Sequence, residues 1–213
     1  MINIDKVEIV GWDHAIRGMR NPLNSWKLSD SDYEIYYDEG GWSHEVFTIG
    51  ENDLKLMTRL ASAGTDHAKY RRMITVYADL VAPLYWWKEY DTYKVGTVAN
   101  SCSTMHKIQA KEFTVNDFSH EQLDYTSKCM LKDIISVLNK NRELFINTKD
   151  KQYWWNMIQL LPSSYNQKRT VMLNYEVLRN MYNSRRSHKL DEWREFCKWI
   201  ESLPYSELIT GGC

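Results

Sequence analysis

The sequence predicts an α+β fold in which an antiparallel or mixed sheet is flanked by helices. Short segments of alternating apolar and polar residues predict strands. Longer segments with apolar residues three and four positions apart predict helices between and after these strands. Neither a Gly-x-Gly-x-x-Gly motif nor a Walker loop occurs, so a Rossmann or P-loop nucleotide site is not expected. We therefore expect helices packed beside an antiparallel sheet, in one domain spanning residues 1–213.

The first half of the chain is expected to alternate strands with two helices. In order, we expect a strand at residues 7–10, a helix at 14–19, and strands at 33–37 and 45–49 around the Gly40-Gly41 turn. A helix that Asn52 or Asp53 caps and Gly64 ends should follow, and then a strand over 69–80. In the last of these strands one side is apolar, which predicts a half-buried strand. Its apolar residues are Ile74, Val76, Ala78 and Leu80.

The second half contains longer helices and an irregular segment. We expect a helix at residues 84–90 with Pro83 in its first turn, then an irregular segment at 91–106 and a strand at 107–115. One long helix or two abutting helices should follow over 119–147. The chain should end with a strand that ends at Asn174, a helix that carries Asn180, and a last helix that Pro204 stops. Long irregular segments rich in Thr, Ser, Asn and Gly are commonly binding loops. Residues 91–106 are therefore a candidate ligand-binding loop.

Composition limits the classes of function. The chain has 213 residues, a formal net charge of -1 and a pI near 6.6. Its net charge therefore gives no general electrostatic attraction to nucleic acid. It has no apolar stretch of membrane-spanning length, and its beginning lacks the pattern of a signal peptide. We expect a cytoplasmic protein without a membrane or nucleic-acid partner. The nine Trp and fourteen Tyr residues suit ligand-stacking surfaces or large subunit interfaces, or else a dense aromatic core.

The four cysteines show neither a CxxC spacing nor a metal-binding pattern with the six histidines. This predicts free thiols in a reducing compartment and no metal site. They are Cys102, Cys129, Cys197 and Cys213. Cys102 lies in the candidate binding loop, which suggests a nucleophile. The alternative is a small buried apolar side chain, and it is favoured because no base is visibly paired with Cys102.

A set of polar residues late in the chain is the most informative feature for function. Asn174 ends the predicted strand and is a suitable N-cap, Asn180 follows on the helix, and Arg185 and His188 lie where this helix stops. Asn174 and Asn180 can both face a cleft. An asparagine offers a donor and an acceptor to a heteroaromatic ring edge, and an arginine offers a fork of donors to a phosphate or carbonyl. The alternative is that Asn174 merely caps the helix and Arg185 is a solvated charge at its end.

The order of these residues resembles the C-terminal signature of the flavin-dependent thymidylate synthases. The similarity comprises Leu160-Leu161-Pro162, then Asn174, Asn180 and Arg185, and Ser187-His188 before the last helix. A second similarity runs from Ala82-Pro83 to Asn100-Ser101-Cys102-Ser103, and His67 lies where the family places a histidine ahead of its strand. The resemblance covers roughly residues 50 to 203.

The sequence departs from the family pattern at several cationic positions. The Arg-His-Arg motif of the family falls on Thr92-Tyr93-Lys94, so Lys94 is the one cation kept there. Asn100 and Ser103 match, whereas Ser101 replaces a glutamate and Met105 replaces a phosphate-binding arginine. Ile158 lies near the position of another arginine. The chain thus resembles a remote or diverged member of the family.

The resemblance implies a homotetramer that converts dUMP to dTMP, or that methylates a related pyrimidine nucleotide. Methylenetetrahydrofolate would donate the carbon, and FAD reduced by NADPH would carry the hydride. Arg185 would be the catalytic residue, since it would hold the pyrimidine and favour the charge that develops on its ring. The nucleotide would also contact Lys88, Glu89 and Ser103. FAD would contact His67, Tyr93, Lys94, Asn100, Ser101, Asn174 and Asn180.

Two classes of function remain open at this point. The first is an active flavoenzyme, which the retained Asn174, Asn180, Arg185 and Ser103 favour. The second is a diverged relative without catalysis, which binds a nucleotide or acts as an oligomeric binding protein, and the lost arginines favour this class.

Overall fold

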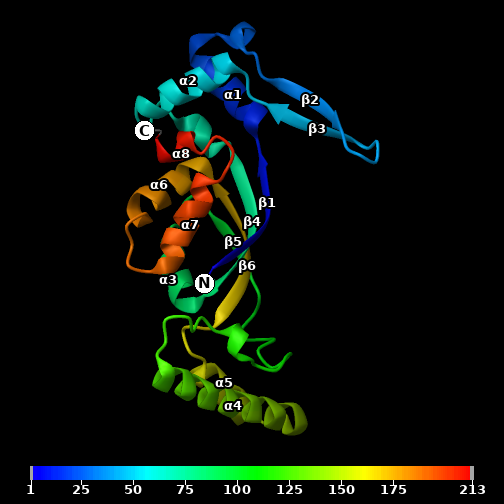
Figure 1. Ribbon diagram of the computed structural model, residues 1–213, viewed down its shortest axis with the longest axis vertical. Coiled ribbons are helices and arrows are strands. Elements are labelled where there is room, and N and C mark those ends of the chain that lie inside the picture. Colours follow the sequence, from blue (N-terminus) through cyan, green and yellow to red (C-terminus); the bar gives the residue numbers. More distant parts are fainter. Residues whose placement is uncertain (1, 212–213) are drawn as a thin grey trace. The chain divides into compact units, whose positions relative to one another are not determined.

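The computed structural model describes residues 2–211 (Figure 1). The chain divides into two compact units. Unit 1 is formed by Met1–Lys6, Ala78–Lys94 and Ala99–Val171, and unit 2 by Val7–Tyr77, Val95–Val98 and Met172–Cys213.

The main sheet has four strands in the order β1-β4-β6-β5. These are β1 (Asn3–Val10), β4 (Thr75–Pro83), β5 (Val98–Ser101) and β6 (Asn166–Asn174). In β4 the side chains of Val76, Ala78, Leu80 and Ala82 are buried, as the alternating pattern predicts. In β6, Val171 and Leu173 are buried in the same alternating way. Together with the helices beside it, the sheet confirms the predicted α+β class.

A separate antiparallel hairpin joins β2 (Asp32–Tyr37) to β3 (Ser43–Thr48), drawn in blue at the upper right of Figure 1. Asp32 pairs with Thr48 and Tyr37 with Ser43. Gly41 in the turn has a φ of 79°, a backbone conformation that glycine adopts without strain. The two strands predicted around Gly40-Gly41 are thereby confirmed.

The α-helices described in unit 2 are α1 (Trp12–Arg20), α2 (Glu51–Ser62), α6 (Tyr175–Arg185), α7 (Asp191–Glu201) and α8 (Glu207–Thr210). The α6 helix packs against α7 and α8, and α2 packs against α1 and α8. Their apolar faces bury Met57, Leu178, Trp193, Phe196 and Leu208 completely. The predicted helices at 14–19, around Asn180 and before Pro204 are confirmed, whereas α8 was not predicted.

Unit 1 contains α3 (Leu84–Tyr90), α4 (Tyr125–Thr148) and α5 (Lys151–Leu160). The α4 and α5 helices pack together over a core of Ile108, Phe113, Phe118, Leu131, Leu138 and Met157. None of the helices within residues 2–211 combines the length and the hydrophobicity that a membrane span requires.

Pro83 is the N-cap of α3 and still part of β4, so it precedes the first turn instead of lying in it.

The predicted cap of α2 is wrong. The helix begins at Glu51 after Gly50, so Asn52 and Asp53 lie in its first turn. Asp30, from outside the helix, accepts hydrogen bonds from the backbone N–H groups of Asn52 at 2.9 Å and Asp53 at 3.1 Å. These are donors that a local cap would otherwise satisfy. Asp53 is thereby free for another role, and its carboxylate is fully buried against Arg20.

The strand predicted over 69–80 is confirmed only for its second half, and the strand predicted at 107–115 is wrong. Residues Lys69–Arg72 form a 3-10 helix, and β4 starts only at Thr75. The 3-10 turn brings the buried Arg71 side chain to 2.9 Å from the carboxylate of Glu176. Residues 107–115 form no strand, because Asn139 takes both backbone groups of Phe113: its Oδ1 accepts from the N–H and its Nδ2 donates to the carbonyl.

The long helix predicted over 119–147 starts later than expected. Asp124 caps it by accepting a hydrogen bond from the Ser127 N–H at 2.7 Å, and the single helix α4 runs to Thr148. A second helix, α5, follows after Asp150 and was not predicted. The segment 91–106 contains the short strand β5 among its turns, so only part of it is irregular.

Candidate functional site

In unit 2 the junction of β6 and α6 positions Asn174. This residue ends β6 and caps α6, and its Oδ1 accepts a hydrogen bond from the Val177 N–H at 2.9 Å. Gly96 lies against this junction with a φ of 80°, and a Cβ on it would lie 3.0 Å from Asn174 Nδ2 and 2.9 Å from Val177 Cγ2. Asn174 is thus a helix cap, and its Nδ2 is the group that can donate to a ligand.

Asn180 lies six residues further along α6 and is exposed. Six residues correspond to about 600° of helix rotation, so the Asn174 and Asn180 side chains leave the axis about 120° apart. Asn174 is half-buried, in contrast. A cleft shared by both side chains stays a prediction.

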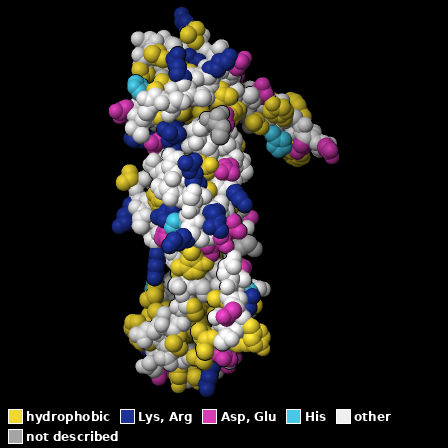
Figure 2. Space-filling view, turned by 60° about the vertical axis from the view of Figure 1, so that its left-hand side comes forward, with side chains coloured by type: hydrophobic (Ala, Val, Ile, Leu, Met, Phe, Trp, Pro, Cys, Tyr) yellow, Lys and Arg dark blue, Asp and Glu magenta, His cyan; other side chains and the backbone are white. Residues whose placement is uncertain are grey.

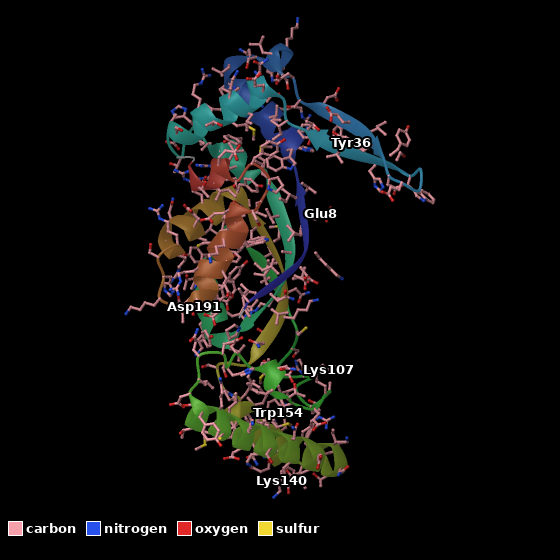
Figure 3. All side chains as sticks on the ribbon, viewed as in Figure 1. Glu8, Tyr36, Lys107, Lys140, Trp154 and Asp191 are labelled. Carbon is pink, nitrogen blue, oxygen red and sulfur yellow. The ribbon has the colours of Figure 1, made fainter. Side chains whose placement is uncertain are left out.

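Arg185 lies in the last turn of α6 and is half-buried. Its guanidinium carbon lies 4.8 Å from the centre of the Trp193 ring. Trp193 belongs to α7, whose first residue Asp191 is labelled in Figure 3, and its side chain is fully buried. The guanidinium is therefore stacked on a fixed ring, unlike a freely solvated charge.

His188 lies near the same tryptophan. Its ring centre is 6.4 Å from that of Trp193, in an edge-to-face arrangement. The Leu190 N–H donates to His188 Nδ1 at 3.2 Å, which leaves Nε2 to carry the proton of the neutral ring. Arg185 and His188 are thus brought together around one aromatic side chain.

His67, also in unit 2, lies in the exposed turn that follows α2. Its backbone N–H donates to the Gly64 carbonyl at 3.1 Å. The imidazole is therefore accessible, as a ligand contact would require. The flavin contact itself stays a prediction.

In unit 1 the helix α3 presents Lys88 and Glu89. It buries Trp86, Trp87 and Tyr90 on its inner side, while Lys88 is exposed and Glu89 is half-buried. Burial raises the pKa of the Tyr90 hydroxyl, which keeps that group neutral. The inner aromatic residues fix the helix and leave Lys88 available to a ligand.

The loop after α3 carries five further predicted residues. Tyr93 is half-buried, whereas Lys94, Asn100, Ser101 and Ser103 are exposed. Asn100 and Ser101 end strand β5, next to β6 in the sheet. Ser103 Oγ accepts a hydrogen bond from the His106 N–H at 2.9 Å and keeps its own O–H to donate.

Arg169 is a cation of unit 1 that no sequence motif indicated. Its guanidinium carbon lies 4.2 Å from the centre of the Trp87 ring, its Nη1 donates to Asp91 at 2.7 Å and its Nε donates to Gln167 at 3.0 Å. Asp91 directly precedes Thr92, where the family pattern has its first arginine. The sequence pattern that could have indicated Arg169 is the alternation in β6, because it places Arg169 on the same side of the strand as the buried residues Gln167 and Val171.

Two cavities lie apart from the predicted site residues. One, of about 410 Å³ in unit 2, is called the leucine cavity here and is lined by Arg20, Leu23, Ser25, Leu28, Asn52, Lys55, Leu56 and Arg59. The other, of about 370 Å³ in unit 1, is lined by Met105, His106, Gln109, Phe145, Lys151 and Trp154, the last labelled in Figure 3. Neither is lined by a predicted site residue.

Cys102 is exposed, so it does not pack as the buried apolar side chain favoured above. Its backbone N–H donates to the Lys168 carbonyl at 2.9 Å, next to strand β6. Within residues 2–211, no three His, Cys, Asp or Glu side chains cluster in a way that could hold a metal ion.

Solved structures match this architecture over nearly the whole chain. Thymidylate Synthase X (ThyX) from Helicobacter pylori with FAD and dUMP has a TM-score of 0.67 at 16% identity, over 99% of this chain and 98% of that one. The fold is that of the flavin-dependent thymidylate synthases. A further Helicobacter pylori ThyX structure with FAD and dUMP has a TM-score of 0.63 at 17% identity, over 97% and 99% of the two chains.

A methylase that is not named as a thymidylate synthase shares the fold too. The UMP/dUMP methylase PolB from Streptomyces cacaoi, bound with 5-Br dUMP, has a TM-score of 0.61 at 14% identity, over 99% of this chain and 95% of that one. No protein-family model and no curated protein matches the sequence. At these identities the likeness establishes the fold.

Proposed function

We propose that this protein is a flavin-dependent methyltransferase that converts dUMP, or a related pyrimidine nucleotide, into its 5-methyl derivative. Methylenetetrahydrofolate would donate the carbon and NADPH the electrons. The observation that carries the proposal is the fold likeness over 99% of the chain to a thymidylate synthase solved with FAD and dUMP. When bound, the flavin would supply hydride chemistry that amino-acid side chains lack.

The polar side chains predicted to contact FAD have hydrogen-bonding groups that suit a flavin. Asn174 Nδ2 and the exposed amide of Asn180 can donate to the acceptor atoms of a heteroaromatic ring. Lys94 lies on the loop after α3, and Asn100 and Ser101 lie at the end of β5. All three are exposed polar groups and would hold the phosphates and ribose. Tyr93 and His67 would add contacts to the flavin from their own segments.

Arg185 would hold the pyrimidine nucleotide. Its stacking on Trp193 restricts the guanidinium plane, which reduces the entropy lost when the fork binds a carbonyl or phosphate. Charge-assisted hydrogen bonds from the fork would also stabilise negative charge on the pyrimidine ring. Lys88, Glu89 and Ser103 would complete the nucleotide contacts.

Arg169 adds support where the family pattern has lost its cations. It lies beside Asp91, directly before the Thr92-Tyr93-Lys94 segment, and its side chain is fixed by Trp87 and Gln167. Asp91 balances the charge of Arg169, so we propose that Arg169 offers a flavin diphosphate oriented N–H donors there and no net charge. The alternative function is a relative that binds the nucleotide without catalysis, and the substitutions at Thr92 and Met105 favour it.

The proposed assembly is a homotetramer. Large aromatic side chains remain exposed in the single chain, such as Tyr37, Trp42 and Tyr125, and oligomer interfaces are enriched in such residues. Light scattering should then give a mass near four times 25.3 kDa.

The test begins with the colour of the purified protein. Bound oxidised flavin gives a visible absorption band, and the supernatant after denaturation should fluoresce. A colourless protein that does not bind FAD on titration would refute the proposal. A protein that binds FAD and dUMP but neither oxidises NADPH in the presence of dUMP and methylenetetrahydrofolate nor yields dTMP would instead establish the binding alternative.

A further inference from the structure

The β2–β3 hairpin has one apolar face. Cross-strand partners lie on the same side of a sheet, so the pairs Tyr33–Phe47 and Ile35–Glu45 share one face with Tyr37. The Tyr33 and Phe47 rings pack edge to face with their centres 5.0 Å apart. We call this surface the aromatic face; it comprises Tyr33, Ile35, Tyr37, Phe47 and Glu45.

Most of this face is open to solvent in the single chain, although Phe47 is half-buried. Tyr33 is 49%, Ile35 60% and Tyr37 73% exposed, and Trp42 at the turn is 75% exposed. Every residue of β2 is exposed. A two-stranded hairpin is marginally stable in water unless one face is covered. The hairpin therefore needs a partner for its aromatic face.

The charge of the hairpin indicates the kind of partner. Residues 32–48 contain five Asp or Glu and no Lys or Arg. Figure 2 shows hydrophobic side chains in yellow and acidic ones in magenta along this arm. On the opposite face Glu34 already accepts hydrogen bonds from Thr48 and from Tyr36, the residue labelled in Figure 3. Glu45 is the acid on the aromatic face, so the partner should offer a cation among apolar groups.

The leucine cavity has this character. Leu23 and Leu28 on its rim are 53% and 66% exposed, which provides an apolar surface. Arg20 in the cavity is neutralised by Asp53 at 2.6 Å. Lys55 is paired with Glu51 at 2.6 Å, whereas Arg59, one helical turn further along α2, forms no ion pair within residues 2–211. The cavity thus presents positive charge beside exposed leucines.

We propose that the aromatic face of one copy docks on the leucine cavity of a second copy, with Glu45 facing Arg59. Each copy carries both surfaces, so the contact can be made twice in a closed two-fold pair. Apolar burial would provide most of the affinity, and the acid–base pair would set the register. The inference names the contact within the proposed homotetramer and is independent of flavin or nucleotide binding.

Charge reversal tests the contact, with the mass measured by light scattering over a dilution series. Glu45→Arg and Arg59→Glu each place like charges opposite one another at both contacts of the two-fold pair. Each variant should therefore weaken association roughly tenfold or more. An equimolar mixture of the two variants should associate as wild type does, because both contacts then pair opposite charges. The double variant Glu45→Arg with Arg59→Glu should also recover. This recovery separates a lost contact from a misfolded hairpin.

Lys198→Glu is the matched control, since Lys198 is an exposed cation on α7 of the same unit. It should leave the association unchanged. A wild type that is monomeric at 25 kDa would overturn the inference, as would reversals without effect or a mixture that does not recover. FAD titration of the same samples keeps these outcomes apart from the proposed function, because a flavin-binding monomer would refute only the contact.

Discussion

The guanidinium of Arg185 lies over the Trp193 ring, 4.8 Å from its centre, and so joins the end of α6 to the core of α7. Trp193 is fully buried, and its position is set by its edge-to-face contact with Phe196 at 5.7 Å. An arginine stacked in this way keeps one plane and can direct its outer N–H groups at a planar ligand. The residue predicted for substrate binding is therefore prearranged by the hydrophobic core.

We predict that Arg185→Lys weakens the binding of dUMP roughly tenfold or more, a loss of about 1.5 to 3 kcal/mol. Lysine keeps the charge, but it can neither stack in the same plane nor offer two parallel hydrogen bonds. Calorimetry of dUMP against both proteins measures the change. Arg186→Lys is the control, because Arg186 is exposed and leaves the helix about 100° away. Equal affinities for all three proteins would place Arg185 outside the site.

Substitutions of Asn174 can distinguish its role as the helix cap from its proposed contact with the flavin. Asn174→Asp keeps an oxygen acceptor for the Val177 N–H and adds a favourable charge at the helix N-terminus, so the melting temperature should not fall. It removes the Nδ2 donor, so FAD affinity should fall about tenfold. Asn174→Ala should lose both, with a stability cost of about 1 kcal/mol. If Asn174→Asp binds FAD as well as wild type, Asn174 is only a cap.

Periodicity along the chain predicted most of the elements around this site. Strand β4 is recognisable because the buried Val76, Ala78 and Leu80 alternate with more exposed residues, and α6 because Asn174 precedes a helical pattern. These signals are local, since they depend on residues within two turns or two strand repeats of one another. The polar residues at the ends of such elements could therefore be predicted too.

Features that depend on distant residues were missed for the converse reason. Asp30 caps α2 from 22 residues upstream of Asn52, and no pattern inside the helix reveals this. Asn139 occupies the backbone of Phe113 from 26 residues away, which removes the strand expected at 107–115. Arg169 became a site candidate only when the fold placed it beside Asp91, 78 residues earlier in the chain.

Gly96→Ala should destabilise the protein by about 2 to 3 kcal/mol, of which roughly 1 kcal/mol is backbone strain at positive φ. The remainder would come from the new Cβ, which would lie 2.9 Å from Val177 Cγ2 and 3.0 Å from Asn174 Nδ2. Gly41→Ala isolates the strain, because Gly41 has a φ of 79° and no atom within 4 Å of an added Cβ. Urea unfolding compares the variants. Equal losses would show that Gly96 needs only its backbone freedom and does not support Asn174 by contact.

The last prediction concerns acid stability and the buried pair of Asp53 with Arg20. Burial on its own would raise the pKa of Asp53, but hydrogen bonds from Ser29, Ser31 and Arg20 lower it below the ordinary 3.8. A carboxyl with a lowered pKa stabilises the fold at neutral pH, and this stability is lost as the pH falls below about 3.8. Asp53→Asn should cost about 3 to 5 kcal/mol at pH 7, because Arg20 is left buried without a counter-charge. It should also flatten the loss of stability in acid, measured by urea unfolding at pH 7 and pH 3. Glu51→Gln, at an exposed acid of the same helix turn, should change stability by less than about 1 kcal/mol. If both variants lose the same small amount, the pair does not anchor α1 to α2.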